Sequence, residues 1–134
     1  MSRVRDDEVI PSGALAAKMG IEWVEVDPKR VVARMPVEGN TQPLGLLHGG
    51  ASGVLAETLA SVGGWLNAPD RMVLGLELKI NHLRSAREGW LTGTAVPVHL
   101  GRTTQLWEIR IIAEDDRLVA FSTCTLAVRS ATEA

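Results

Sequence analysis

One long amphipathic segment constrains the fold of this chain more than any other feature. From Gly49 to about Asn67, mostly apolar residues recur at the three- and four-residue spacing of an α-helix. They form one stripe: Ala51, Val54, Leu55, Thr58, Leu59, Val62 and Leu66. A helix of this length extends about 28 Å, at ~1.5 Å per residue. The stripe therefore needs an equally long partner from the rest of the chain.

Strand patterns supply that partner. Four long strands are predicted after the helix, over residues 71–84, 90–100, 103–113 and 117–128. Two shorter strands before it, 21–26 and 30–35, meet at the turn Asp27-Pro28-Lys29, and a short helical turn is predicted over 12–18. These elements indicate an α+β fold, in which a curved antiparallel sheet of consecutive strands wraps around one long central helix. We expect one domain over residues 1–134, with residues 1–10 poorly ordered.

Charge and composition exclude several classes of function. Fourteen basic and sixteen acidic residues give a net charge of −2, so we expect no nucleic-acid partner. The sequence has no long uncharged apolar run, and its first residues lack the apolar core of a signal peptide. We therefore expect a cytoplasmic protein without a membrane partner. Cys124 is the only cysteine and lies in a strand pattern, which favours a structural role.

The predicted helix carries a second, unusual face. At about 100° per residue, a set of small residues and one acid fall together, away from the apolar stripe: Gly50, Gly53, Glu57, Ser61 and Gly64. Interior glycines cost on the order of 1 kcal/mol each relative to alanine. We therefore expect a close approach by another backbone or a ligand along this face. Between Gln42 and Leu66 the only ionisable side chains are His48 and Glu57, so Glu57 is the candidate functional acid.

The helix start offers a complementary group. Backbone N–H groups in the first turn, at Gly49 and Gly50, are unpaired within a helix and lie at its positive end. They are suited to polarise a carbonyl that a carboxylate or an activated water attacks. Gly49 and Glu57 are eight residues apart, however, which is ~12 Å along a straight helix. The residues therefore predict a homodimer in which the helix start of one copy faces Glu57 of the other.

A family resemblance accompanies these motifs. Residues 42–61, with Leu47-His48-Gly49-Gly50 and Leu55-Ala56-Glu57-Thr58, resemble the hotdog-fold acyl-CoA thioesterases, in the branch with 4-hydroxybenzoyl-CoA and 1,4-dihydroxy-2-naphthoyl-CoA thioesterases. The resemblance continues through 75–78, 81–89 and 99–101 and covers residues 15–128. It implies a hotdog fold, a homodimer that usually pairs into a homotetramer, and no metal or redox cofactor.

The resemblance also implies residue roles. Glu57 is then the catalytic carboxylate, as nucleophile or general base, and the Gly49 N–H polarises the thioester carbonyl. Gln42 and His48 orient the carbonyl and the helix start, and Ser61 helps to hold the water. The CoA and substrate contacts implied are Gly75, His82, Leu83, Arg84, Ser85, His99, Leu100, Gly101, Arg102, Thr103 and Thr104. The histidines at 48, 82 and 99 match no metal-ligand spacing, so no metal site is expected.

Two alternatives to hydrolysis remain from the sequence. One is a non-catalytic acyl-CoA binding dimer, whose pocket would look similar. The other is a CoA-ester dehydratase, which uses a histidine base in a helix-start pattern different from that of Gly49, Gly50 and Glu57. The acyl group cannot be read from these residues, and an aryl group is favoured on resemblance alone.

Overall fold

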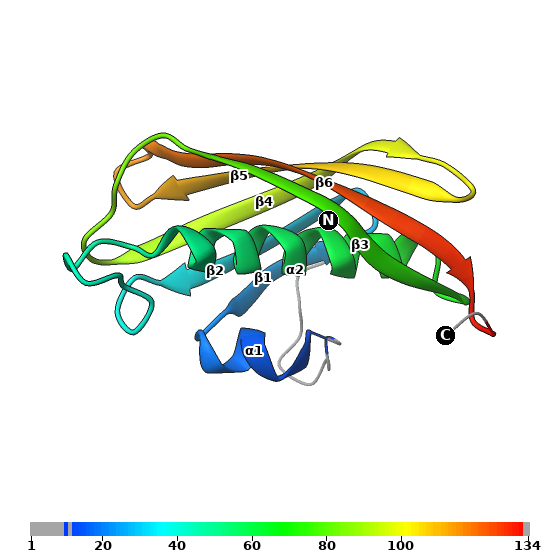
Figure 1. Ribbon diagram of the computed structural model, residues 1–134, viewed down its shortest axis with the longest axis horizontal. Helices are drawn as coiled ribbons and strands as arrows, with labels where there is room; N and C mark the ends of the chain where they lie inside the picture. Colours follow the sequence, from blue (N-terminus) through cyan, green and yellow to red (C-terminus); the bar gives the residue numbers. More distant parts are fainter. Residues whose placement is uncertain (1–9, 11, 133–134) are drawn as a thin grey trace.

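The computed structural model describes residue 10 and residues 12–132, so the expectation for residues 1–10 falls, apart from Ile10, outside the described residues. Six strands form one antiparallel sheet that curves around a single long helix (Figure 1). The elements are α1 (Gly13–Lys18), β1 (Glu22–Asp27), β2 (Arg30–Pro36), α2 (Gly49–Asn67), β3 (Arg71–His82), β4 (Trp90–Leu100), β5 (Thr104–Ala113) and β6 (Leu118–Ser130). The α+β architecture and the bounds of the long helix are as the sequence predicts.

The strand order corrects one expectation. The sheet runs β1-β2-β4-β5-β6-β3, so β2 pairs with β4 and β3 crosses to pair with β6. Consecutive strands are therefore not neighbours throughout, although every pairing is antiparallel. Because of this crossover, β3 becomes an edge strand that lies beside α2 (Figure 1).

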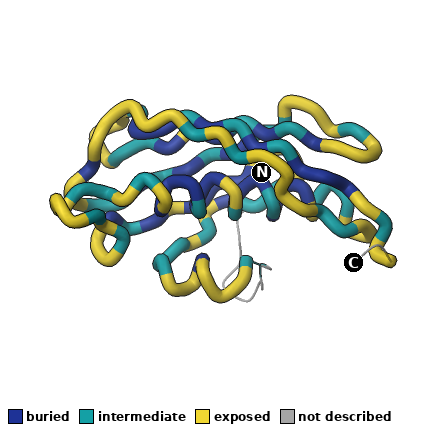
Figure 2. The backbone as a smooth tube through the Cα atoms, viewed as in Figure 1, coloured by how far each residue is buried: buried dark blue, intermediate teal, exposed yellow. Residues whose placement is uncertain are grey.

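The core lies between α2 and the concave face of the sheet. Leu55 and Leu59 of α2 are fully buried, as are Trp107, Ile109 and Ile111 of β5. Period-2 burial along β4 and β5 shows that alternate residues face the helix. Figure 2 shows burial concentrated in α2 and the middle strands. The apolar stripe of the helix thus meets the sheet as expected.

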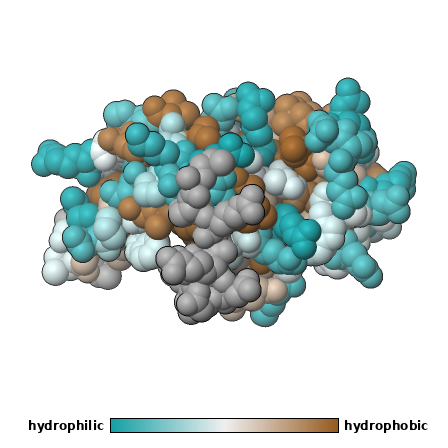
Figure 3. Space-filling view, turned by 180° about the vertical axis from the view of Figure 1, so that it is seen from behind, coloured by the Kyte–Doolittle hydropathy of each residue, from teal (hydrophilic) through white to brown (hydrophobic). Residues whose placement is uncertain are grey.

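Several large apolar side chains stay outside this core. Leu74 and Leu76 on β3 are 50% and 59% exposed, and Val98 near the β4–β5 turn is 57% exposed. Figure 3 shows hydrophobic surface in separate patches on the side opposite to that of Figure 1. On the edge strand β3, Leu74 and Leu76 lie beside backbone groups that no neighbouring strand pairs, a combination that favours association with another chain.

Candidate active site

The start of α2 is fixed by its cap and by the preceding loop. His48 is the N-cap residue, and its Nδ1 accepts a hydrogen bond of 2.8 Å from the Gly50 N–H. The loop is held by Asn40, whose Nδ2 donates to the carbonyl oxygens of Met19 and Pro36 at 2.8 Å each, and whose carbonyl accepts from His48 N. Within the described part of the chain, the Gly49 N–H has no hydrogen-bond partner. One donor at the positive end of the helix is therefore free for a ligand.

Gln42 adds a second free donor. Its Oε1 accepts a short hydrogen bond from the Leu44 N–H, which fixes the side-chain amide. The other half of the amide, Nε2, donates to no group among the described residues. Gln42 and Gly49 line the same pocket, as the sequence-based roles require.

His82, at the end of β3, comes directly over the helix start. A Cβ atom at Gly49 would lie only 2.9 Å from Nε2 of His82 and 3.0 Å from its Cε1. The absence of a side chain at Gly49 therefore allows the imidazole to approach the helix backbone. The sequence placed His82 among substrate contacts, and the fold brings it against Gly49.

Glu57 lies on the exposed side of α2, facing β3. No described residue forms a hydrogen bond or an ion pair with its carboxylate, although a Cβ at Gly75 would lie 2.9 Å from Oε2. The register of β3 against β6 shifts between Gly75 and Glu77, so a bulge falls beside the acid. Burial, followed by the negative charge of Glu57, raises the pKa of Cys124 to about 12. The Cys124 thiol is thus protonated and buried, consistent with a structural role.

Two cavities flank Glu57 and differ in character. A cavity of about 370 Å³ runs along α2 and β3 and is lined by Gly49, Glu57, His82 and the apolar side chains Val54, Leu78 and Ile80. A second cavity, of about 140 Å³, is lined by Glu57, by Val62 and by three hydroxyl residues, Ser12, Thr58 and Ser61. Ser61 therefore lies one turn from the acid in a small polar space.

A third cavity adjoins the helix start. It also measures about 370 Å³ and shares Gly49 and His82 with the apolar cavity beside Glu57. Its other lining residues include the predicted Gln42, Leu83, Arg84 and Ser85, together with Leu47, Ser52 and Val119. Gly49 and His82 therefore stand where two cavities meet.

Part of the predicted helix face is corrected. Gly53 and Gly64 are buried, because Leu78 covers the first and Leu126 and Val73 pack on the second. Gly50 and Glu57 are exposed, and Ser61 is half-buried. The close approach that the glycines permit is therefore made partly by side chains of β3 and β6.

The predicted residues of the β4–β5 turn do not join this site within one chain. Leu100, Gly101 and Arg102 line a cavity of about 400 Å³ with Asn67, at the far end of α2. The two ends of a 19-residue helix are about 27 Å apart, and Figure 1 shows the β4–β5 turn at the end of the sheet away from the helix start. The His99 ring packs over Gly101, and the Gly101 N–H donates to the Thr104 carbonyl at 2.9 Å.

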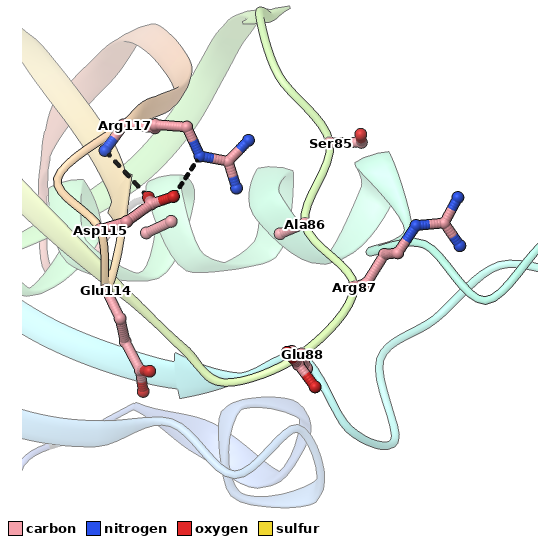
Figure 4. Close-up of a pocket in the computed structure, with 8 residues that line it drawn as sticks. Ser85, Ala86, Arg87, Glu88, Glu114, Asp115 and Arg117 are labelled. Carbon is pink, nitrogen blue, oxygen red and sulfur yellow. Dashed lines mark hydrogen bonds and ion pairs between the residues drawn. The ribbon is translucent and has the colours of Figure 1, made fainter.

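A cavity of about 360 Å³ beyond Ser85 contains charges of its own (Figure 4). Arg117 donates to the Asp115 carboxylate, with 2.6 Å between Nε and Oδ2, and Glu114 Oε1 accepts from the Trp90 N–H at 3.0 Å. In Figure 4 the Arg87 side chain points away from the Asp115–Arg117 pair. This cavity shares only Ser85 with the cavity at the helix start. It is formed by the loop after β3 and the turn between β5 and β6.

The sequence missed several residues of the site. Ser52, Thr58 and Ser12 line its cavities, as do Leu78 and Ile80. The alternating apolar pattern of β3 could have indicated Leu78 and Ile80. Their position beside Glu57, however, depends on the crossover of that strand. Within the described ranges, no three His, Cys, Asp or Glu side chains cluster as a metal site would, and no helix is long and apolar enough to cross a membrane.

Comparison with known proteins shows close similarity to one family. The profile of the Thioesterase superfamily matches residues 44–120. A 1,4-dihydroxy-2-naphthoyl-CoA hydrolase of Listeria monocytogenes is 45% identical over 117 residues, which cover 86% of this chain and 95% of that protein. A proofreading thioesterase of Cronobacter turicensis is 43% identical over 118 residues, covering 87% and 86%. The crystal structure of a thioesterase from Haemophilus influenzae superposes with a TM-score of 0.86 at 40% identity, covering 91% and 87% of the two chains.

Proposed function

The chain belongs to the thioesterase superfamily and is an acyl-CoA thioesterase, and we propose that its substrate is the CoA thioester of an aryl acid, such as hydroxybenzoyl- or dihydroxynaphthoyl-CoA. The relatives named dihydroxynaphthoyl-CoA hydrolase support the aryl group. The geometry that supports thioester hydrolysis is the free Gly49 N–H and the unpaired Glu57 carboxylate, since both residues line one cavity.

The proposed chemistry uses groups of the chain itself and no cofactor. The thioester carbonyl oxygen accepts a hydrogen bond from the Gly49 N–H, with Gln42 Nε2 as a further donor. Glu57 takes a proton from water as the water oxygen bonds to the carbonyl carbon. Collapse of the oxyanion breaks the C–S bond, and CoA leaves as a thiolate, which takes up the proton that Glu57 received and so restores the carboxylate. The products are the free acid and CoA.

The small polar cavity supports general-base catalysis over direct attack by Glu57. The hydroxyls of Thr58 and Ser61 have no hydrogen-bond partner in the described part of the chain, and both line the cavity beside the carboxylate. A volume of about 140 Å³ holds a few water molecules, since each occupies roughly 30 Å³ in the liquid. Water held there is adjacent to the base. We therefore propose that Ser61 helps to hold the attacking water.

The proposed site needs two copies of the chain. Along one helix, Gly49 and Glu57 are ~12 Å apart, whereas a nucleophile must approach the carbonyl to within ~3.5 Å. The exposed Leu74 and Leu76 on the free edge of β3 lie on the strand that borders Glu57. We propose that two chains join at this edge and place the helix start of one copy near Glu57 of the other. Pairing of two such dimers into a tetramer stays a prediction from the family resemblance.

The test is thiol release from a panel of CoA esters by the wild type and by Glu57→Ala. Benzoyl, hydroxybenzoyl, hydroxynaphthoyl, phenylacetyl, hexanoyl and lauroyl esters cover the open acyl classes. We expect the wild type to prefer the aryl esters, and the variant to lose at least a hundredfold in kcat, as the loss of a general base does. Glu38→Ala, which removes an exposed acid of the loop after β2, serves as the control.

The other functions make different predictions in the same assay. Equal rates for wild type and Glu57→Ala would exclude Glu57 as the base. Tight binding of the esters without any thiol release would indicate the acyl-CoA binding dimer. A 3-hydroxyacyl-CoA added to the panel tests the dehydratase, because its conversion to the enoyl-CoA and water, without release of free CoA, would indicate that activity. Preference for hexanoyl or lauroyl esters would leave the thioesterase and reject the aryl substrate.

A further inference from the structure

Ser52 of α2 carries a buried hydroxyl that the fold leaves without a partner. The residue has no exposed surface, and its Oγ makes no hydrogen bond in the described structure. A serine within a helix commonly donates to the carbonyl four residues earlier, and Ser52 does not. The comparably buried Ser122 of β6 donates to the Lys79 carbonyl at 2.8 Å. An unpaired buried hydroxyl is costly, so the position of Ser52 calls for a partner from outside the chain.

The cavity at Ser52 is the third cavity described above, which opens at the helix start. Its residues differ in exposure: Arg84 and Ser85 are exposed, Gln42 and Gly49 are half-buried, and Ser52 and Val119 are buried. The cavity therefore has a polar, open end and a closed end at Ser52. Gly49, which carries the free N–H, is intermediate in exposure between these two groups.

The change in exposure along this cavity favours one orientation of a bound thioester. With its carbonyl oxygen at Gly49, the CoA arm extends past Arg84 and Ser85 to solvent, and the acyl group occupies the closed end. The lining of this cavity includes the apolar residues Leu47 and Val119, of which Val119 is buried like Ser52. Ligand pockets of this kind combine apolar walls with a few polar groups that fix the orientation of the ligand. At the closed end, the unpaired polar group is Ser52 Oγ.

We infer that Ser52 determines specificity: its Oγ forms a hydrogen bond with a polar substituent, such as a ring hydroxyl, on the acyl group in this cavity. The inference rests on the proposed function, since it assumes a thioester at Gly49. A site that holds an unpaired hydrogen-bonding group discriminates strongly against a ligand that lacks the matching substituent. Ser52 then acts on the choice of acyl group and has no part in the chemical step.

The experiment compares kcat/KM of wild type and Ser52→Ala for benzoyl-CoA and for its 2-, 3- and 4-hydroxy derivatives. We expect the wild type to favour at least one hydroxylated ester. In Ser52→Ala that ester should lose about 5- to 30-fold, the effect of one hydrogen bond, while benzoyl-CoA stays within about twofold. Ser52→Cys, which keeps the side-chain size but offers only a weak donor, should show the same selective loss.

Stability measurements separate this role from a structural one. Ser52→Ala removes an unpaired hydroxyl and should keep or raise Tm, whereas the control Ser122→Ala breaks a buried hydrogen bond and should lower it. An equal loss for benzoyl-CoA and the hydroxylated esters, or no change for any of them, overturns the inference. A wild type that releases no thiol from any ester refutes the proposed function instead, so the two failures are distinguishable.

Discussion

At the scale of single residues, the site depends on positions where a side chain is missing. Gly49 leaves room for the His82 imidazole and Gly75 leaves room for the Glu57 carboxylate. The sequence identified Gly49 and Glu57, because a lone acid and paired glycines stand out in an apolar helix. It named His82 as a substrate contact through the family resemblance, but it did not show that His82 packs on Gly49, and it missed Ser52. Both depend on how β3 and the loop after it meet α2, and these segments are distant in the sequence.

Gly49 permits a test of the backbone donor itself. As the first helical residue, with His48 extended at φ −70° and ψ 130°, it occupies a position that proline tolerates. Gly49→Pro removes the N–H and should lower kcat by about 10²–10³, as the loss of one oxyanion donor does. Gly49→Ala introduces a Cβ near His82 but keeps the N–H. Steady-state kinetics should therefore show a much smaller loss in kcat for alanine, and equal losses would assign the effect to His82.

The raised pKa of the buried Cys124 thiol should make the folding stability depend on pH in the alkaline range. Burial, and then Glu57, raise the pKa of its thiol from 9.0 to about 12. Above pH 9 the unfolded thiol loses its proton while the folded one keeps it, so folding stability falls as pH rises from about 9 towards 12. The slope approaches ~1.4 kcal/mol per pH unit. Urea unfolding at pH 8 to 10.5 should show this loss for the wild type relative to Cys124→Ala. A stability difference independent of pH would contradict the shifted pKa.

At the scale of elements, the sequence predicted what depends on local patterns. The bounds of α2 and β4 were correct, and the other strands differed by one or two residues at their ends. The position of β3 could not be predicted, because its alternating pattern fits beside β4 as well as beside β6. The crossover of β3 determines which glycines of α2 are covered by side chains. For this reason the prediction that Gly53 and Gly64 face another backbone or a ligand needed correction.

The glycines of α2 should respond differently to alanine. A Cβ at Gly63 would lie 2.7 Å from Cζ3 of Trp107, whereas one at Gly53 would make an ordinary contact of 3.6 Å with Leu78. Gly63→Ala should therefore destabilise the fold by about 1–3 kcal/mol through overpacking. Gly53→Ala should be neutral or stabilising by up to ~1 kcal/mol from helix propensity. Chemical unfolding measures both, and a stable Gly63→Ala would mean that Trp107 moves freely.

At the scale of the whole molecule, the proposed site is divided between two chains. The free edge of β3, its exposed leucines and the separation of Gly49 from Glu57 along α2 all favour this arrangement. The separation follows from the predicted helix, but the sequence does not show which surface would join the copies, because the free edge exists only after β3 has crossed to pair with β6.

Mixing two inactive variants tests the shared site. Glu57→Gln and Gly49→Pro each destroy both sites of their own homodimer. A mixed dimer has one site with an intact Gly49 and an intact Glu57. Random exchange of subunits at equal concentrations should thus restore about a quarter of wild-type activity, because half of the dimers are mixed and each has one working site. No recovery, with exchange verified by native mass spectrometry, would place each site within a single chain.

The composition of α2 bears finally on the order of folding. Five of its 19 residues are glycine, so the isolated segment has little tendency to form a helix. The hairpins β4–β5 and β5–β6 pair strands that are adjacent in sequence, whereas β3 must reach β6 across both. We therefore expect the central helix and the edge strand to consolidate after the hairpins have paired. The candidate active site, which lies where these two elements meet, should then be among the last parts of the molecule to form.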